Sequence, residues 1–360
     1  MKKALSLLLS AALALSLLAG CGPSSSGSDV SGSGSDVSGS GSDSSSGGSS
    51  ADTSQTPADA PEVNFMVLSG PTGVGAAQLI DSYSADSAPA DAPFVLNTTV
   101  EADNQVVSNA LVNGTVDIAA VATNVAATLS AKTDGAVQVL AVNTLGVLYI
   151  LEKGDSVHSL ADLAGKTVYA TGQGANPEYA LNYLLTQNDV DPASVDIQWM
   201  TAQEVTAQMT SSEEAICMLP VPAATALMVQ DSGVRQALSL SEEWENLGEG
   251  PLPMGCIVAR TQYIEENPEG VEAFLNAYEA SIDYMSDPAN LEDAAQLVAQ
   301  FEITPNAKVA AAAIPQCTLT YVTGKEMRTM LEDYYSVLFQ TAPDSIGGSL
   351  PYDSFYYGVG

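Results

Sequence analysis

DIAAVATN, at residues 117–124, is the stretch of sequence that decides the fold. Its first part, residues 117–121, lacks the polar and apolar alternation of a half-exposed strand, so we predict a strand buried on both faces. Thr123 and Asn124 follow at once, and a helix is predicted from there through Leu129. A buried strand that leads directly into a helix is the repeating unit of an α/β sheet.

The same unit recurs on both sides of this segment. Strands are predicted at residues 63–68, 94–98, 137–142 and 145–151, and helically spaced apolar residues follow the first two. Gly114 stands where the residue just past a helix is expected. Continuous apolar strands separated by helices predict a mostly parallel sheet that is covered on both faces.

A second α/β series follows Lys153. In chain order it comprises a helix at 159–165, a strand at 167–170, a loop at 172–177 that opens a helix, a strand at 195–199, a helix at 202–210, a strand at 215–219 and a helix at 223–229. A strand at 256–259 then returns, and the tail is helical, with apolar stripes over 271–285 and 327–338. We expect Asn267 to cap the first tail helix.

The composition excludes several classes of protein. Only 10 Lys and Arg oppose 43 Asp and Glu, a formal net charge of -33, so no basic surface exists to neutralise a nucleic-acid backbone. The single histidine, His158, and four scattered cysteines offer no cluster of zinc ligands. We therefore expect no nucleic acid, no metal and no cofactor. With 46% hydrophobic residues, the chain can bury two cores.

The amino terminus predicts export. Residues 1–20 join a basic start, Lys2 and Lys3, to an apolar run, and LAGC at residues 18–21 resembles the bacterial lipobox, in which the cysteine is acylated. We expect residues 1–20 to be a signal peptide and Cys21 to be the lipidation site. A transmembrane anchor is the alternative, but three serines interrupt the run, which falls short of the roughly 20 apolar residues that span a bilayer.

Residues 21–60 are expected to be a disordered spacer behind the lipid. Between residues 22 and 60, 24 of 39 residues are Ser or Gly, and such a chain buries too little apolar surface to offset its ordering entropy. The spacer would tether a folded body to the outer face of the cytoplasmic membrane.

Six motifs, in this order, carry a family resemblance. They are GPTG at 70–73, DIAAVATN at 117–124, SLADLAGKT at 159–167, GQGANP at 172–177, LPVP at 219–222 and ENPE at 266–269. From about residue 62 onward the chain resembles the type 2 periplasmic-binding fold of the solute-binding lipoproteins of ABC importers, in the nitrate, sulfonate, taurine and thiamine-precursor branch. The resemblance implies an α/β protein with a ligand cleft between two lobes.

The resemblance also implies how the chain is divided and what it does. Lobe 1 would comprise residues 61–150 and 252–360, and lobe 2 residues 151–251. The protein would be a monomer without enzymatic activity. It would capture a small polar or anionic organic solute between the lobes, close over it, and deliver it to the permease subunits of an ABC importer.

Three loops are expected to hold the solute, at residues 69–73, 122–124 and 172–176. Each follows a strand and opens a helix, where free backbone N–H groups and the positive end of the helix dipole attract polar or anionic groups. The residues expected to bind the ligand are Ser69, Gly70, Pro71, Thr72, Gly73, Thr123, Asn124, Gly174, Ala175, Asn176, Pro220 and Val221.

One position departs from the family pattern. Relatives often carry Leu-Pro-Glu-Pro where this chain has LPVP, so a site carboxylate is missing at Val221. Tyr149, Tyr179 and Trp199 are candidate aromatic walls of the cleft, and Gln173 is a further polar side chain of the third loop.

The body cysteines, Cys217, Cys256 and Cys317, lie in apolar runs. An exported setting permits one disulfide among them, and the sequence does not select a pair.

Three alternative functions stay open. A ligand sensor or an interaction lipoprotein can use the same cleft without transport. An enzyme of this fold with a lysine-bound cofactor would need a histidine in the cleft, whereas His158 lies in a polar connector. Gly172 and Gly174 resemble the start of a dinucleotide-binding loop, but Pro177 occupies the position of its third glycine.

Overall fold

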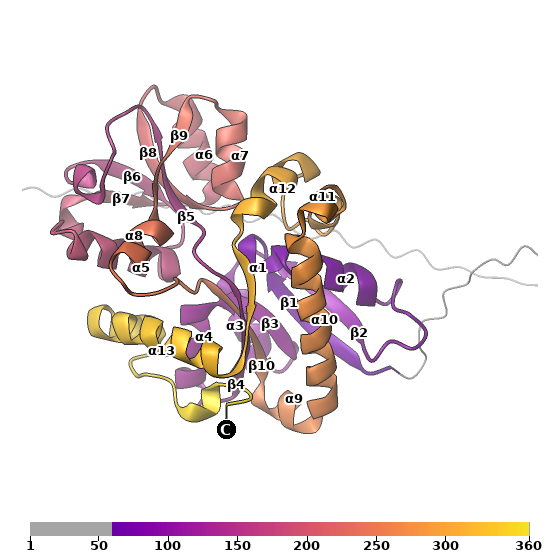
Figure 1. Ribbon diagram of the computed structural model, residues 1–360. Helices are drawn as coiled ribbons and strands as arrows, with labels where there is room; N and C mark the ends of the chain where they lie inside the picture. Colours follow the sequence, from indigo (N-terminus) through magenta and orange to yellow (C-terminus); the bar gives the residue numbers. More distant parts are fainter. Residues whose placement is uncertain (1–59, 360) are drawn as a thin grey trace, which may run out of the picture. The chain divides into compact units, whose positions relative to one another are not determined.

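The computed structural model describes residues 60–359, and the predicted signal peptide, the lipidation site Cys21 and the Ser/Gly-rich spacer lie outside these residues. The described chain forms two β-sheets, each flanked by helices (Figure 1). Each sheet with its helices is called a lobe below.

Lobe 1 is built on a six-stranded sheet. In spatial order its strands are β11 (Leu319–Val322), β4 (Val137–Thr144), β10 (Gly255–Arg260), β3 (Ile118–Ala122), β1 (Glu62–Leu68) and β2 (Val95–Glu101). β1 pairs in parallel with β2 and β3, whereas β10 is antiparallel to β3 and β4, and β11 is antiparallel to β4. The first four strands of the chain therefore point one way and the two later strands the other.

Lobe 2 is built on a five-stranded sheet. In spatial order its strands are β7 (Asp196–Trp199), β6 (Thr167–Ala170), β8 (Ala215–Pro220), β5 (Leu148–Lys153) and β9 (Val234–Ser239). β6 is parallel to β7 and β8, and β5 is antiparallel to β8 and β9.

The chain crosses between the lobes twice. It leaves β4 through residues 145–147 to enter β5, and it returns through residues 247–254 to β10. Because β10 comes back from lobe 2, it enters the first sheet against the direction of β3 and β4, and Gly255 lies opposite Thr144. The boundary predicted after residue 150 falls inside β5, which pairs only with strands of lobe 2.

Helices cover both sheets and fill the connections. The α-helices are α1 (Pro71–Val74), α2 (Ala77–Tyr83), α3 (Asn104–Val112), α4 (Thr123–Lys132), α5 (Asn176–Gln187), α6 (Ala202–Ser211), α7 (Ala223–Gln230), α8 (Leu240–Asn246), α9 (Thr261–Glu266), α10 (Pro268–Ser286), α11 (Leu291–Gln300), α12 (Ala307–Ala313) and α13 (Gly324–Thr341). Short 3-10 helices include η1 (Leu160–Leu163), η5 (Pro343–Ile346) and η6 (Asp353–Phe355).

The predicted fold class, two helix-flanked α/β sheets, is confirmed. The sheets are mixed rather than mostly parallel, because β5 and β10, the strands that follow the two crossings, are each antiparallel to both of their neighbours. The stripe predicted over residues 271–285 lies on α10 and packs on the sheet of lobe 1, where the Phe274 ring lies 5.2 Å from the Phe65 ring. Asn267 precedes α10 as predicted, but its side chain makes no capping hydrogen bond to the helix; its Nδ2 donates to the Tyr263 carbonyl oxygen. Seven strands and α-helices were not predicted from the sequence: β9, β11, α1, α8, α9, α11 and α12.

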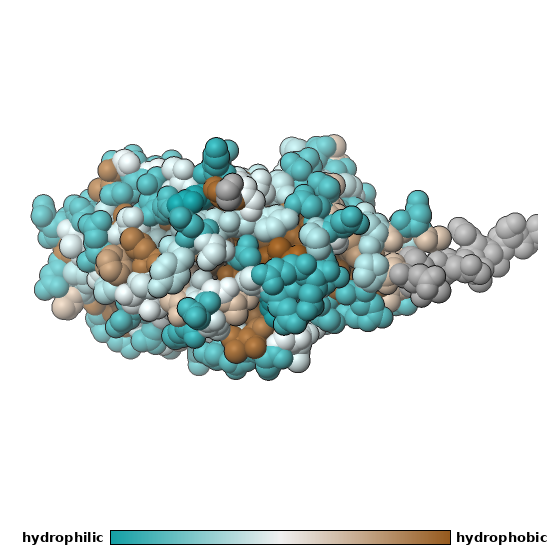
Figure 2. Space-filling model, turned by 90° about the horizontal axis from the view of Figure 1, so that it is seen from below, coloured by the Kyte–Doolittle hydropathy of each residue, from teal (hydrophilic) through white to brown (hydrophobic). Residues whose placement is uncertain are grey.

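The three body cysteines, Cys217, Cys256 and Cys317, are buried and free, so they form no disulfide with one another. Within residues 60–359, no helix has the length and apolar character to cross a membrane. The face of the molecule seen in Figure 2 is largely hydrophilic, and its apolar residues lie in separate small patches.

Candidate functional site

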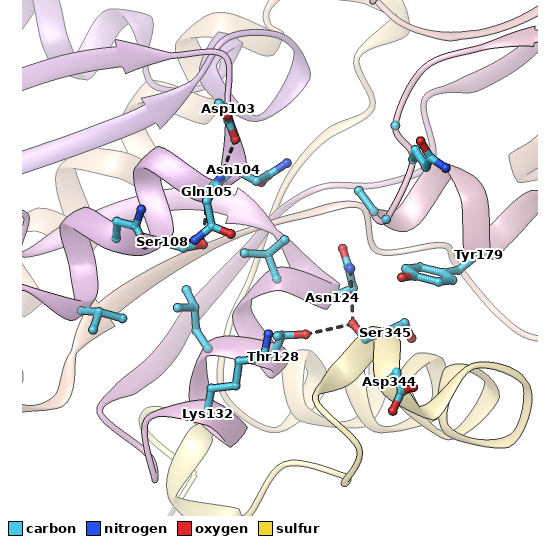
Figure 3. Close-up of a pocket in the computed structure, with 18 of the residues that line it drawn as sticks. Asp103, Asn104, Gln105, Ser108, Asn124, Thr128, Lys132, Tyr179, Asp344 and Ser345 are labelled. Carbon is cyan, nitrogen blue, oxygen red and sulfur yellow. Dashed lines mark hydrogen bonds between the residues drawn. The ribbon is translucent and has the colours of Figure 1, made fainter. Parts of the chain in front are cut away.

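A polar cavity of about 860 Å³ lies between the lobes. Lobe 1 contributes the turn from β2 to α3, one side of α3 and α4, and the segment of η5, and lobe 2 contributes the loop before α5 and its first turn (Figure 3). The polar side chains of its wall belong to Asp103, Asn104, Gln105, Ser108, Asn109, Asn124, Thr128, Lys132, Thr133, Thr171, Gln173, Tyr179, Asp344 and Ser345.

Asn124 lies in the first turn of α4, which begins where the buried strand β3 ends. Its side chain is 2% exposed, and its amide Nδ2 donates to the Ser345 carbonyl oxygen at 3.4 Å. Its Oδ1 has no hydrogen-bond partner and points away from Ser345 into the cavity (Figure 3). A buried amide oxygen without a donor is costly, so this atom marks a place for a ligand group.

The loop of lobe 2 lies on the opposite wall. Gly172 and Gly174 adopt positive φ angles of 92° and 73°, and a Cβ on Gly172 would come within 2.5 Å of the Pro177 ring. The Gly174 N–H donates to the Glu178 carboxylate at 2.6 Å, and the Ala175 N–H donates to the Gly172 carbonyl oxygen. These two N–H groups, which we expected to face the solute, are therefore already paired within the loop.

Asn176 joins the two lobes rather than facing the cavity. Its side chain is fully buried, and its Nδ2 donates to the Thr123 hydroxyl oxygen and to the Met254 carbonyl oxygen, each at 2.9 Å. Its Oδ1 accepts a hydrogen bond from the Tyr334 hydroxyl at 2.9 Å. The Thr123 hydroxyl in turn donates to the Pro253 carbonyl oxygen, so both of these predicted site residues have protein partners.

The predicted loop at residues 69–73 lies outside this cavity. The Ser69 N–H donates to the Glu101 carbonyl oxygen, Gly70 adopts a φ of 107°, and Pro71 opens α1. Thr72 is buried, and its carbonyl oxygen accepts a hydrogen bond from the Asn143 amide. A Cβ on Gly73 would meet the Leu68 carbonyl oxygen at 2.4 Å.

Pro220 and Val221, at the end of β8, also lie outside the cavity wall. Val221 is fully buried, and its N–H donates to the Val147 carbonyl oxygen. A role for either residue, or for residues 69–73, in solute binding stays a prediction.

Of the three candidate aromatic walls, Tyr179 lines the cavity and Tyr149 and Trp199 do not. The pKa of Tyr179 is raised by burial and, further, by the negative charges of Glu178 and Asp344. The carboxylates of Glu178 and Asp344 therefore both act on the Tyr179 hydroxyl.

Two segments of the wall were not predicted. One is the turn after β2, in which Asp103 is the side-chain N-cap of α3. This turn lies at the same sheet edge as the loops after β1 and β3. The expectation that loops between a strand and the next helix bind the solute would therefore have included it. The other segment is η5, with Asp344 and Ser345, in the carboxyl-terminal part of the chain. No local sequence pattern indicates that η5 packs on α4.

The cavity wall, as residues 60–359 form it, holds no cluster of metal-binding side chains. Among residues 60–359, no three His, Cys, Asp or Glu side chains are placed to hold a metal ion. His158 is exposed in lobe 2, where its Nε2 lies 3.8 Å from Asp155, and it is not part of the cavity wall.

These features define a two-lobed α/β protein with a polar cavity between its lobes. Residues 99–290, more than half of the chain, match the family model described as NMT1/THI5 like, and the chain belongs to that family. Comparison with curated proteins gives no match.

Solved structures of other proteins share the fold. An ABC transporter protein from Parabacteroides distasonis aligns with a TM-score of 0.66 at 19% identity, over 82% of this chain and 98% of that one. The periplasmic aliphatic sulphonate binding protein SsuA from Escherichia coli gives 0.64 at 17% identity, over 80% and 96% of the two chains. The periplasmic nitrate-binding protein NrtA from Synechocystis PCC 6803 gives 0.56 at 14% identity, over 80% and 84%. The type 2 periplasmic-binding fold implied by the sequence motifs is thereby confirmed.

Proposed function

We propose that this protein is the extracytoplasmic solute-binding component of an ABC importer, which captures a small polar organic solute between its lobes and delivers it to a membrane permease. The observation that carries the proposal is the polar cavity between the lobes, in which Asn124 Oδ1 is buried without a partner. The solved proteins that share the fold are named as ABC transporter or periplasmic binding proteins, and none of those described above is named as an enzyme.

The two walls of the cavity fit a mechanism of capture by closure. A ligand shifts an equilibrium between open and closed forms only if it binds one form more tightly, which here requires contact with both lobes. Asn124 offers an acceptor from lobe 1, and Tyr179 offers a ring and a hydroxyl from lobe 2 (Figure 3). Within residues 60–359 the sheets are joined covalently by the crossing segments at residues 145–147 and 247–254, so these segments would absorb the movement.

The setting of the protein is part of the proposal. The LAGC motif at residues 18–21 supports export and lipid attachment at Cys21, and the Ser/Gly-rich residues that follow would leave the folded body free to meet the permease. A monomer suffices, because both walls of the cavity come from one chain.

A thermal-shift panel tests the proposal. The protein is melted alone and with sulfonates, inorganic anions, pyrimidine precursors, amino acids and amines, and a cognate solute at about 1,000 times its Kd should add about 4 kcal/mol of stability. Asn124→Ala should reduce this shift, whereas Asn276→Ala, at an exposed position of α10, should leave it unchanged. If no solute of the panel changes the melting temperature, or Asn124→Ala leaves a shift intact, solute capture in this cavity is contradicted.

A further inference from the structure

The unpaired polar atoms of the cavity wall include two acceptors. Asn124 Oδ1 and Asn104 Oδ1 are both buried without a hydrogen-bond partner. The orientation of the Asn124 amide is fixed, because its Nδ2 donates to the Ser345 carbonyl oxygen and a flipped amide would place two oxygens against each other. An unpaired acceptor calls for a ligand that donates a hydrogen bond.

The charges of the wall favour the same kind of ligand. Asp103 and Asp344 line the cavity, and neither carboxylate belongs to an ion pair within residues 60–359. Lys132 is the one cationic side chain of the wall, and no arginine reaches it. A cation is attracted by these two exposed carboxylates, which outnumber Lys132, whereas an anion is repelled by them.

The backbone donors at the entry to α5 that would bind an oxyanion are already paired. The N–H group of Gly174, at the entry to α5, is neutralised by the Glu178 carboxylate, and that of Ala175 is bound to a carbonyl oxygen. Asn176, in the first turn of the same helix, directs its amide protons at Thr123 and Met254. These hydrogen-bond donors at the amino-terminal end of α5 are therefore not free to bind an anion.

We propose that the solute is an organic cation, carrying an ammonium or another protonated nitrogen whose N–H is accepted by Asn124 Oδ1 and whose charge is attracted by Asp344. This inference rests on the proposed function and specifies its substrate class. Tyr179 completes the arrangement, because an aromatic ring is an attractive neighbour for a cation.

Probes of matched shape and different charge test the substrate class. Benzylamine, benzyl alcohol and benzenesulfonate share one ring, and choline and nitrate extend the set to a quaternary cation and an inorganic anion. Binding to the full chain is measured by titration calorimetry at about 150 mM NaCl, which screens loose attraction to the acidic surface. We expect one-to-one binding of at least one cation, and no binding of benzenesulfonate or nitrate.

Two exposed aspartates give the matched variants. Asp344→Asn removes one carboxylate of the cavity wall and should weaken cation binding about tenfold. Asp91→Asn makes the same change at an exposed position outside the cavity and should leave the Kd unchanged. Because both side chains are exposed, both variants are expected to fold like the parent, which their melting curves check.

Each outcome decides something different. Binding of benzenesulfonate or nitrate without binding of either cation overturns the inference and leaves solute capture standing. Cation binding that Asp344→Asn does not weaken also overturns it, because the cation then lies elsewhere. If no probe of either charge binds, the cation inference falls and the proposed function loses its support as well.

Discussion

At the scale of single residues, Asn176 holds the lobes together. Its amide is fully buried and makes three hydrogen bonds, two to the region of Thr123 and Met254 and one to Tyr334. Asn124, the residue after Thr123, is buried too, but its Oδ1 has no hydrogen-bond partner. Two asparagines that look alike in the sequence therefore differ in what they contribute.

Replacing each asparagine separates stability from binding. Asn176→Ala leaves the Tyr334 hydroxyl buried without its acceptor and should cost about 2–3 kcal/mol of unfolding free energy. Asn124→Ala removes the unpaired Oδ1 and the single long hydrogen bond that Nδ2 donates. It should therefore cost less than about 1.5 kcal/mol of unfolding free energy while weakening solute binding. Urea unfolding of both, with Asn276→Ala as the exposed control, tests this order. Equal losses in the two variants would contradict it.

Glu152, in β5, predicts a pH dependence. Burial by itself would raise the pKa of this carboxyl, but hydrogen bonds from the Ser156 hydroxyl and N–H and the Val157 N–H, with the charge of Arg235, outweigh it and hold the pKa below 4.5. A lowered folded-state pKa adds stability above the unfolded pKa, and this stability is lost as the pH falls through the folded pKa.

Glu152→Gln should therefore destabilise the protein at about pH 7 by about 2–3 kcal/mol, and by less once the pH has fallen through the lowered folded-state pKa of Glu152, because the native carboxyl is then protonated too. Melting temperatures of the variant and the parent across this range measure the difference. Glu213→Gln, at an exposed neighbouring position, is the control. A difference that does not shrink toward acid pH would show that the Glu152 charge is not responsible.

At the scale of elements, η5, which follows α13 near the far end of the chain, contributes Asp344 and Ser345 to the cavity wall. Tyr334 and Tyr335 of α13 donate to Asn176 and to the Thr123 carbonyl oxygen, and the helix then leads into η5. There the Ser345 carbonyl oxygen accepts from Asn124 and from the Thr128 hydroxyl. The seating of η5 on α4 thus fixes the orientation of the Asn124 amide.

Two adjacent glycines test that seating. Gly347 and Gly348 have φ angles of 83° and 85°, so an alanine at either is strained by about 1 kcal/mol. A Cβ on Gly347 would lie 2.6 Å from the Ala131 Cβ of α4, whereas nothing lies within 4 Å of one on Gly348. Gly347→Ala should therefore push η5 off α4, lower the melting temperature further than Gly348→Ala, and weaken solute binding. Equal effects of the two substitutions on binding would mean that this contact does not shape the cavity.

The elements also show what the sequence could predict. β3 was predicted because a buried strand is a continuous apolar run, and α10 because seven of its residues form one buried stripe. β11 was missed because it is a short, half-exposed antiparallel strand that only its pairing with β4 stabilises. In α11, Leu291, Ala294, Ala295 and Val298 do have helical spacing, so this helix was predictable and was overlooked.

The candidate site was predictable to the extent that it follows strand ends. Asn124 and the loop before α5 were found in this way, and the turn at Asp103 could have been. Asp344 and Ser345 could not, because only tertiary packing brings them to α4. A sequence motif also does not indicate whether a side chain is buried. Asn176 was predicted to contact the solute, but it is buried in a contact between the lobes.

At the scale of the whole molecule, charge repulsion is the dominant feature. The chain carries 43 acidic and 10 basic side chains, and ion pairs such as Arg260 with Asp117 and Lys153 with Asp231 neutralise few of the acids. A large net charge keeps a protein soluble but opposes its compact state.

Added salt should therefore stabilise this protein. Between about 10 mM and about 300 mM NaCl the Debye length falls from about 30 Å to below 10 Å, which screens the repulsion between distant carboxylates. We expect the melting temperature to rise over this range and then to level off. A fall would mean that the few ion pairs outweigh the repulsion, and an equal rise with sucrose, matched for osmolality, would rule out a charge effect.

The pairing of Thr144 with Gly255 has a topological consequence. The chain departs for the second sheet beside the strand through which it returns, so the whole of β5 to β9 is an insertion whose two ends are neighbours. Such a segment can be exchanged as a cassette without displacing either terminus. Grafting the segment from β5 to β9 of a relative with a known ligand would yield a chimera. Its ligand preference would show which of the two proteins supplies the contacts that select the ligand.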